Sequence, residues 1–334
     1  MTTGGFESVT IEGFKSIRQI KDLALRQINL LIGANGSGKS NFLEAFIFLG
    51  AAHAGHIDSY VEYQGGAERL LHYGSKTTKG IFVHASAYSG FSMTANYFYV
   101  DGDQLAGATT RGGLSWDEPS FNRHRFVDTG DDSPLKKTSS IDDNRSLSRL
   151  GGNLAAFLYR LSQTHRDSYE IIRKTVQQVA PFFDDFQLAP RALNPETIRL
   201  EWRHKHSDAY FNAASLSDGT LRFIALATLF LQPLELRPAV ILVDEPELGL
   251  HPYAIELLAS LIRQASVDTQ VIAATQSPLL LDYFDPEDIL VADRKDGATT
   301  IHRLQAEPLA EWLKEYSLGQ LWEKGEFAGR PVKE

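Results

Sequence analysis

The sequence predicts an α/β fold in which helices connect the strands of a mixed or parallel sheet. A compact apolar run at residues 28–32 is followed by a helical pattern at 42–49. Near the other end of the chain, a second apolar run at 239–243 precedes a helical stretch at 253–264 and a strand at 271–275. Strands that alternate with helices in this order are typical of a parallel sheet with crossover helices.

The remaining segments have other patterns. Apolar alternation at 9–14 predicts a short strand, so that 6–33 contains two strands in all. Aromatic and β-branched residues dominate 81–100 and predict an antiparallel hairpin or meander, whereas the Gly, Ser and Asp content of 101–144 indicates long loops. After these segments we expect helical structure over 153–179 in one or two helices, a strand over 198–206 and a helix over 220–231.

Composition excludes several classes of protein. The chain of 334 residues is 43% hydrophobic and 22% charged, which is the composition of a globular protein. Zero cysteines exclude disulfides, thiolate metal sites and a cysteine nucleophile. The longest predominantly apolar run has nine residues, Phe223 to Leu231, with Thr228 as its one polar member, and the first residues lack the features of a secretory signal. We therefore expect a soluble, cytoplasmic protein without membrane partners.

Net charge argues against indiscriminate binding to nucleic acid. The formal net charge is -9, and residues 251–334 carry -6 of it. Binding to a phosphate backbone depends on clustered Lys and Arg. One candidate cluster surrounds Trp202, and its charged residues could contact phosphates or form a solvated strand face; they are Arg199, Arg203, His204, Lys205 and His206.

The first apolar run leads directly into a phosphate-binding motif. Gly33-Ala-Asn-Gly-Ser-Gly-Lys-Ser40 matches G-x-x-x-x-G-K-[ST] without departure. Glycines allow backbone N–H groups to turn toward an anion, Lys39 can reach the β- and γ-phosphates, and the Ser40 hydroxyl can bind Mg²⁺. Because a strand precedes the loop and a helix follows it, we favour a nucleotide site over a plain glycine-rich turn.

A second motif ends the apolar strand Ala239-Val-Ile-Leu-Val243. Asp244 at the end of such a strand can hold a Mg²⁺-bound water, and Glu245 can orient or deprotonate an attacking water. Taken alone, the two acids could simply end a core strand. The phosphate-binding loop favours the catalytic interpretation.

A third motif, Leu216-Ser-Asp-Gly-Thr220, precedes the helix expected over 220–231. Ser217 and the N–H groups of Asp218 and Gly219 at a helix N-terminus can bind an anion. The same residues could instead act only as a helix cap.

Together these motifs resemble the ABC-type ATPase heads of the RecF/SMC-like superfamily of P-loop NTPases. The resemblance is to small bacterial ATPases related to RecF and the OLD family. It is carried by TIEGFKSI, INLLIGANGSGKSNFLEA, SLSDGTLRF, ILVDEPELGLHP and VIAATQSP, which cover about 6–50 and 210–285.

The resemblance implies an ATP- and Mg²⁺-dependent homodimer in which each ATP contacts both subunits. In one subunit, ATP would be bound by Gly33, Ala34, Asn35, Gly36, Ser37, Gly38, Lys39, Ser40 and Asn41, with Lys15 near the phosphates. The opposing subunit would contribute Ser217, Asp218 and Gly219. Ser40 and Asp244 would hold the metal, Glu245 would be the catalytic base, and residues 248–251 would lie at the dimer seam.

Two positions depart from the family pattern. Gln276 stands where transporter-type cassettes usually have histidine; it can hydrogen-bond a γ-phosphate but cannot take its proton, so it would sense the phosphate. Asp218 replaces the second signature glycine and brings a negative charge near a phosphate, unless its side chain points away or caps the helix. Gln64 is the candidate for the Q-loop glutamine.

The predicted division is an ATPase core at 1–52 and 207–334, with an inserted β-rich and helical lobe at 53–206. Because 184 residues without heptads separate Gly33 from Ser217, the chain lacks a long coiled coil.

We expect an enzyme that hydrolyses ATP and dimerises head to head, in DNA repair or maintenance or in antiphage defence with a separate effector such as a nuclease. The alternative is a nucleotide-switched protein scaffold that does not bind DNA. A transporter cassette is disfavoured because no element that would couple to a membrane protein is recognisable.

Overall fold

The computed structural model describes residues 5–113 and 121–327. The chain forms two compact units: unit 1 comprises Met1–Arg123, Pro238–Asp244 and Ser266–Glu334, and unit 2 comprises His124–Arg237 and Glu245–Ala265. The strands between residues 80 and 112, which the sequence placed in the inserted lobe, belong to unit 1. None of the helices within 5–113 and 121–327 is long and apolar enough to span a membrane.

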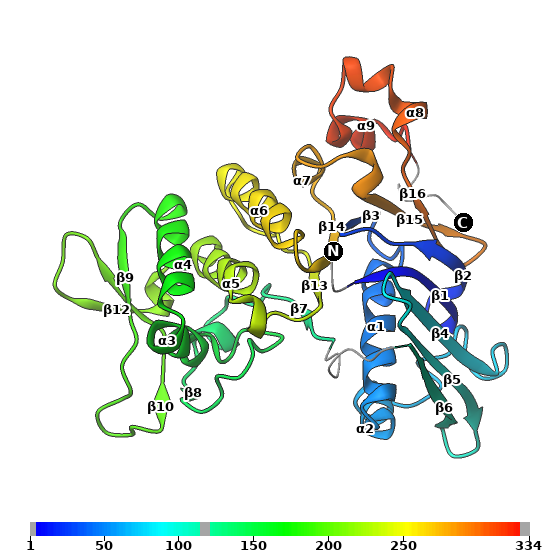
Figure 1. Cartoon of the computed structure of the whole chain (residues 1–334), viewed down its shortest axis with the longest axis horizontal. Helices are drawn as coiled ribbons and strands as arrows, with labels where there is room; N and C mark the ends of the chain where they lie inside the picture. The colour runs from blue at the N-terminus through cyan, green and yellow to red at the C-terminus, as the bar shows by residue number, and fades with distance from the viewer. Residues whose placement is uncertain (1–4, 114–120, 328–334) are drawn as a thin grey trace. The chain divides into compact units, whose positions relative to one another are not determined.

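Unit 1 contains the predicted parallel sheet (Figure 1). Its strand order is β16-β15-β3-β14-β13-β7. The strands are β3 (Ile28–Ile32), β7 (Arg123–His124, where the chain leaves unit 1), β13 (Val240–Asp244), β14 (Gln270–Thr275), β15 (Ile289–Lys295) and β16 (Ala298–Arg303). Strands β15, β3, β14 and β13 are parallel, and β16 is antiparallel to β15, so the sheet is mixed as expected.

A second, antiparallel sheet in unit 1 has the order β2-β1-β4-β5-β6. It consists of β1 (Phe6–Phe14), β2 (Ile17–Ala24), β4 (Gly80–Ala87), β5 (Ser92–Val100) and β6 (Gln104–Gly112). The hairpin predicted over 81–100 is confirmed as β4 and β5. Strands β2 and β6 were not predicted; the apolar residues of β2 do not alternate, and Leu105 is the one buried residue of the edge strand β6.

Helix α1 (Lys39–His53) contacts β14 of the first sheet and β1, β4 and β5 of the second. Its aromatic side chains are fully buried, and the ring of Phe46 lies 5.9 Å from that of Phe6 and 6.4 Å from that of Phe121. This packing fixes the beginning of α1, which is also the end of the phosphate-binding motif. The other helices of unit 1 are short: α2 (Ile57–Tyr63), α7 (Pro278–Leu281), α8 (Ala306–Leu309) and α9 (Leu318–Lys324).

Unit 2 combines helices with small antiparallel sheets (Figure 1). The helices are α3 (Leu154–Thr164), α4 (Arg166–Val179), α5 (Asp218–Leu231) and α6 (Pro252–Ala265). The strands are β8 (Ser139–Ser140), β9 (Phe183–Gln187), β10 (Thr197–Ile198), β11 (Glu201–His204) and β12 (Tyr210–Asn212). The helical periodicity predicted over 153–179 is confirmed as two helices, α3 and α4, which are separated at His165 by a non-helical conformation (φ -138°).

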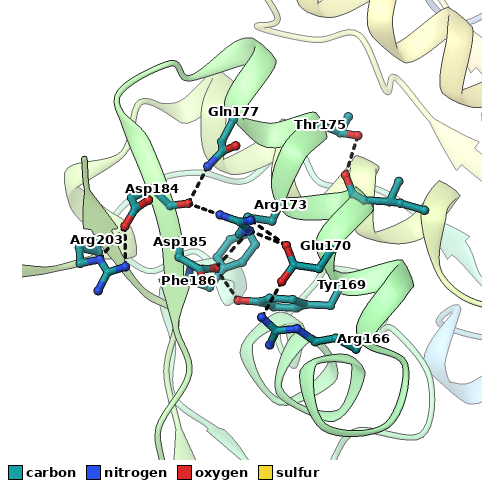
Figure 2. A network of polar contacts seen from close by, with 11 residues as sticks. Arg166, Tyr169, Glu170, Arg173, Thr175, Gln177, Asp184, Asp185, Phe186 and Arg203 are labelled. Atoms are coloured by element: carbon teal, nitrogen blue, oxygen red, sulfur yellow. Dashed lines mark hydrogen bonds and ion pairs between the residues drawn. The ribbon is translucent and has the colours of Figure 1, made fainter. Parts of the chain in front are cut away.

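A polar network joins α4 to β9 and β11 (Figure 2). The Tyr169 hydroxyl donates to Asp185 at 2.7 Å, and Arg173 pairs with Glu170 at 2.7 Å. Arg203 on β11 forms an ion pair with Asp184 at 2.6 Å. The predicted alternation of this segment is confirmed, since Ile198, Leu200 and Trp202 are buried. On the charged face of this segment, however, Arg199 and Arg203 are already paired with Glu201 and Asp184.

Candidate functional site

The candidate site of unit 1 lies where three parallel strands end. In the register of the sheet, Ile32 of β3 is opposite Thr275 of β14, and Asp244 of β13 is opposite Ala274. The phosphate-binding motif begins at the next residue after β3, and Gln276 directly follows β14. Because the carboxyl ends of parallel strands share one edge, the sheet brings the first motif, Asp244 and Gln276 together.

Backbone geometry explains the glycines of the motif. Gly36 and Gly38 have φ of 81° and 102°, in the left-handed region that disfavours other residues. A Cβ at Gly38 would collide with Thr299 and lie 2.7 Å from the Ser16 hydroxyl, whereas one at Gly36 would have no atom within 4 Å. The loop is therefore packed against protein at Gly38 and open at Gly36, as an anion-binding loop requires.

Hydroxyl and amide groups support the loop. The Asn41 side chain donates to the Ser16 hydroxyl at 2.7 Å, and Ser16 is hydrogen-bonded to the Thr299 hydroxyl at 2.7 Å. Thr299 donates in turn to the Ser37 carbonyl oxygen at 2.8 Å. In this structure, Asn41 and the GFKSI segment thus position the loop.

Lys39 and Ser40 have the contacts expected of a nucleotide site. The Lys39 ammonium, which is buried, donates to the carbonyl oxygens of Gly33 at 2.6 Å and Ala34 at 3.0 Å. The Ser40 hydroxyl donates to Asp244 Oδ2 at 3.1 Å. The Ser37 hydroxyl is buried and has no hydrogen-bond partner among the described residues, so the loop retains an unused polar group.

The donor set fits a magnesium ion. Ser40 and Asp244 offer a hydroxyl and a carboxylate, and Mg²⁺ prefers oxygen ligands, usually one or two carboxylates together with substrate phosphates. Within the described parts of the chain, no cluster of three or more His, Cys, Asp and Glu side chains could hold a metal by itself. A metal here would therefore depend on the nucleotide for part of its coordination.

Sequence reasoning missed two charged residues at this site, Glu44 and Arg123. Glu44 lies one helical turn after Ser40, and its carboxylate is 3.2 Å from Arg123 Nη1. Arg123 is also 3.9 Å from Asp244 and 3.4 Å from the Ser40 carbonyl oxygen. Arg123 belongs to no motif, so only the fold identifies it.

Gln64 and Lys15 extend this cluster. Gln64 donates to Glu44 at 2.8 Å and accepts from the Lys15 ammonium at 3.0 Å. Burial lowers the pKa of Lys15 below its ordinary value, an effect that Glu44 partly opposes. In this structure, Gln64 therefore links Lys15 to the acidic residue beside the loop.

In unit 2, Glu245 has a backbone conformation that is rare for glutamate, with φ of 51°. Its carboxylate Oε2 accepts a hydrogen bond from Arg125 Nη2 at 3.0 Å, and the two side chains form an ion pair. This contact also had no signal in the sequence, because the two residues are 120 positions apart.

The third motif forms the beginning of α5, in unit 2. Ser217 is the N-cap and its hydroxyl accepts from the Thr220 N–H at 3.2 Å. The Asp218 carboxylate is 64% exposed and lies 3.9 Å from the ammonium of Lys136, which is nearly buried. Lys136 therefore compensates the negative charge that Asp218 introduces into the signature, and Asp218 is not the cap.

Gly219 and Arg222 connect this motif to the segment after Glu245. A Cβ at Gly219 would lie 2.7 Å from the Gly249 carbonyl oxygen, so the two backbones approach closely. Arg222 on α5 donates to the carbonyl oxygens of Leu248, Phe126 and Val127. The signature and residues 248–249 therefore pack directly against each other within unit 2.

Comparisons with known proteins agree with these motifs. A family model described as "AAA domain, putative AbiEii toxin, Type IV TA system" matches residues 28–282. No curated protein matches the chain in sequence.

The solved structures with the same fold include three SMC heads. The SMC head bound to the C-terminal winged-helix domain of ScpA is 19% identical with a TM-score of 0.65, covering 92% of this chain and 99% of that one. The Pyrococcus furiosus SMC head with an extended coiled coil, bound to the C-terminal domain of ScpA, is 17% identical with a TM-score of 0.58, covering 93% and 98%. The Thermotoga maritima SMC head domain is 16% identical with a TM-score of 0.51, covering 90% and 99%. The predicted fold class is confirmed as an α/β fold like that of an SMC head.

Proposed function

The chain belongs to the AAA_21 family of AAA domains, and from this premise we propose that it binds ATP with Mg²⁺ and hydrolyses it to ADP and phosphate. The observation that carries the proposal is the hydrogen bond from the Ser40 hydroxyl to Asp244. This bond lies beside the phosphate-binding loop, against which the Lys39 ammonium is buried. The loop N–H groups and Lys39 bind the phosphates, and Gln276 senses the γ-phosphate.

The chemistry requires positioning and charge stabilisation more than covalent catalysis. Ser40 and Asp244 would hold Mg²⁺, which would supply positive charge to neutralise the phosphates. Glu245 takes the proton of the attacking water once its carboxylate is released from Arg125, to which it is bonded in this structure.

We further propose that ATP closes two copies of the chain into a homodimer, in which Ser217 and Gly219 of each copy bind the γ-phosphate on the other. Two features of unit 2 support this arrangement. Ser217 and the first N–H groups of α5 form an anion-binding helix N-terminus. Leu248, whose carbonyl oxygen accepts from Arg222 of α5, and Tyr253 are each 47% exposed, so both side chains are available to contact a second copy.

The composite site is tested by Ser217→Asp. Aspartate caps a helix about as well as serine, so α5 should remain intact, but its charge would repel a phosphate from the opposing copy. We expect nucleotide affinity to be unchanged and hydrolysis, measured as phosphate release, to fall about tenfold or more, equivalent to about 1.4 kcal/mol of transition-state stabilisation.

Ser217→Asn is the matched control, because it caps the helix without a charge and should retain most of the activity. An equal mixture of Ser217→Asp and Lys39→Ala should recover part of the activity, since one site of each mixed dimer has an intact loop and an intact signature. No recovery in the mixture would contradict a site shared between subunits.

For the biological output we propose DNA repair or maintenance, or antiphage defence with a separate effector such as a nuclease. The family description, which names a toxin of a toxin–antitoxin system, supports the second of these. The alternative is a nucleotide-switched scaffold that binds protein only; the likeness to SMC heads captured with ScpA domains and the acidic residues 251–334 favour it.

A measurement of DNA binding distinguishes the DNA-linked function from the protein scaffold. The DNA-linked function predicts that the ATP-bound protein binds a short duplex with an affinity that falls steeply as salt rises, measured by fluorescence anisotropy. Arg199 and Arg203 should contribute little, because they are already paired with Glu201 at 2.5 Å and Asp184 at 2.6 Å. Their double replacement by alanine should leave the salt slope unchanged. Absence of binding at low salt would favour the scaffold.

A further inference from the structure

We propose that Arg123 controls entry of the divalent cation: its guanidinium is a counter-ion of Asp244 and competes with the metal for that carboxylate. The inference rests on the proposed function, in which Ser40 and Asp244 hold Mg²⁺. Arg123 is thus a positioning residue that links metal binding to nucleotide binding. All of the residues involved belong to unit 1.

Glu44 fixes the guanidinium at the site. The Glu44 side chain is only 5% exposed, and its Oε1 accepts from the Tyr60 hydroxyl at 2.9 Å and from Gln64 at 2.8 Å. Its Oε2 is 3.2 Å from Arg123 Nη1. Because a buried carboxylate that loses its cation is strongly unfavourable, Arg123 remains beside Glu44 in the folded protein.

The contact of Arg123 with the metal-binding residues is looser than its contact with Glu44. Nη1 is 3.9 Å from Asp244 Oδ2, too far for a hydrogen bond but close enough for a strong interaction between charges. Arg123 Nε is buried and has no hydrogen-bond partner in the part of the chain that the structure describes. A guanidinium in a saturated ion pair uses two parallel hydrogen bonds. Here it neutralises Asp244 without being bonded to it, and a cation can displace that interaction.

The charges of the cluster explain why the metal would require nucleotide. The carboxylates of Glu44 and Asp244 share this region with Arg123, with Lys15, which Gln64 links to Glu44, and with Lys39 of the loop. A divalent cation that enters the site is repelled by these positive side chains. The phosphates of ATP add enough negative charge for the metal and Arg123 to occupy the site at the same time.

The test is Arg123→Gln in the full chain, titrated with Mn²⁺ alone and followed by electron paramagnetic resonance of the free ion. We expect the nucleotide-free variant to bind Mn²⁺ about tenfold more tightly than the wild type, or better, because one repelling charge is gone. Adding Asp244→Asn should abolish the gain. Arg18→Gln is the matched control, since it removes the same charge from an exposed position of unit 1 and should change nothing.

Arg123→Gln leaves Glu44 without its cation and could unfold the protein, so a second pair of variants repeats the test without a stranded carboxylate. Glu44→Gln is compared with Glu44→Gln/Arg123→Gln, in which no carboxylate is stranded, and the same gain in Mn²⁺ affinity is expected between these two. Unchanged Mn²⁺ affinity in folded variants would overturn the proposal. So would a tenfold loss of ATP affinity in EDTA on Arg123→Gln, because the arginine would then be a phosphate ligand. Failure of the wild type to bind ATP at all would instead contradict the proposed function.

Discussion

Replacing Lys39 by alanine should lower the affinity for ATP by about 100-fold, because a charge-assisted hydrogen bond to phosphate contributes about 1.5–3 kcal/mol. The Lys39 ammonium donates to the Gly33 and Ala34 carbonyl oxygens, so it is positioned at the loop. The measurement is a calorimetric titration of the purified variant with ATP in the presence of Mg²⁺.

Lys21→Ala is the matched control for this variant. Lys21 is an exposed lysine of β2, in the same unit, and its loss should leave the affinity unchanged. The thermal midpoint of Lys39→Ala should stay close to that of the wild type, because α1 is stabilised by its buried aromatic residues. Wild-type affinity in a folded Lys39→Ala protein would show that the loop does not bind the phosphates.

The parts of the site that sequence reasoning found are those whose chemistry fixes a local spacing. The glycines, Lys39 and Ser40 must follow one another because one short loop surrounds one phosphate group. Asp244 was found because a strand that is buried on both faces is an uninterrupted apolar run, and the carboxylate follows it directly. The parallel sheet was predicted from the same runs.

The parts that sequence reasoning missed depend on contacts between distant segments. Arg123 lies 83 positions from Ser40, in a segment whose Gly, Ser and Asp content indicated only loops. Lys136 likewise compensates Asp218 from a separate turn, so the effect of the unusual signature residue could not be judged from the motif alone. The break at His165 carries neither proline nor glycine, which are the usual signals for the end of a helix.

Replacing Glu245 by glutamine should slow hydrolysis by about 10²- to 10⁴-fold while ATP binding is retained, because a general base contributes about that factor. Since ATP would then persist between the subunits, the variant should accumulate as a dimer. Light scattering after size exclusion should show the mass rising from the 37.1 kDa of one chain to twice that value, only with ATP and Mg²⁺. Duplex DNA added to the same sample should raise the mass further if the output is DNA-linked.

The variant Arg125→Gln distinguishes the two consequences of Glu245→Gln, which are the loss of the base and the weakening of an ion pair. Glu245→Gln removes the base and also weakens the ion pair with Arg125, whereas Arg125→Gln removes the pair and leaves the base in place. If the loss of proton transfer traps the dimer, Arg125→Gln should hydrolyse ATP at least as fast as the wild type and should not accumulate as a dimer. A dimer trapped equally by both variants would mean that the ion pair, and not hydrolysis, controls separation of the subunits. A mass of Glu245→Gln that ATP does not change would instead contradict ATP-driven closure and would direct the search to a site completed by another protein.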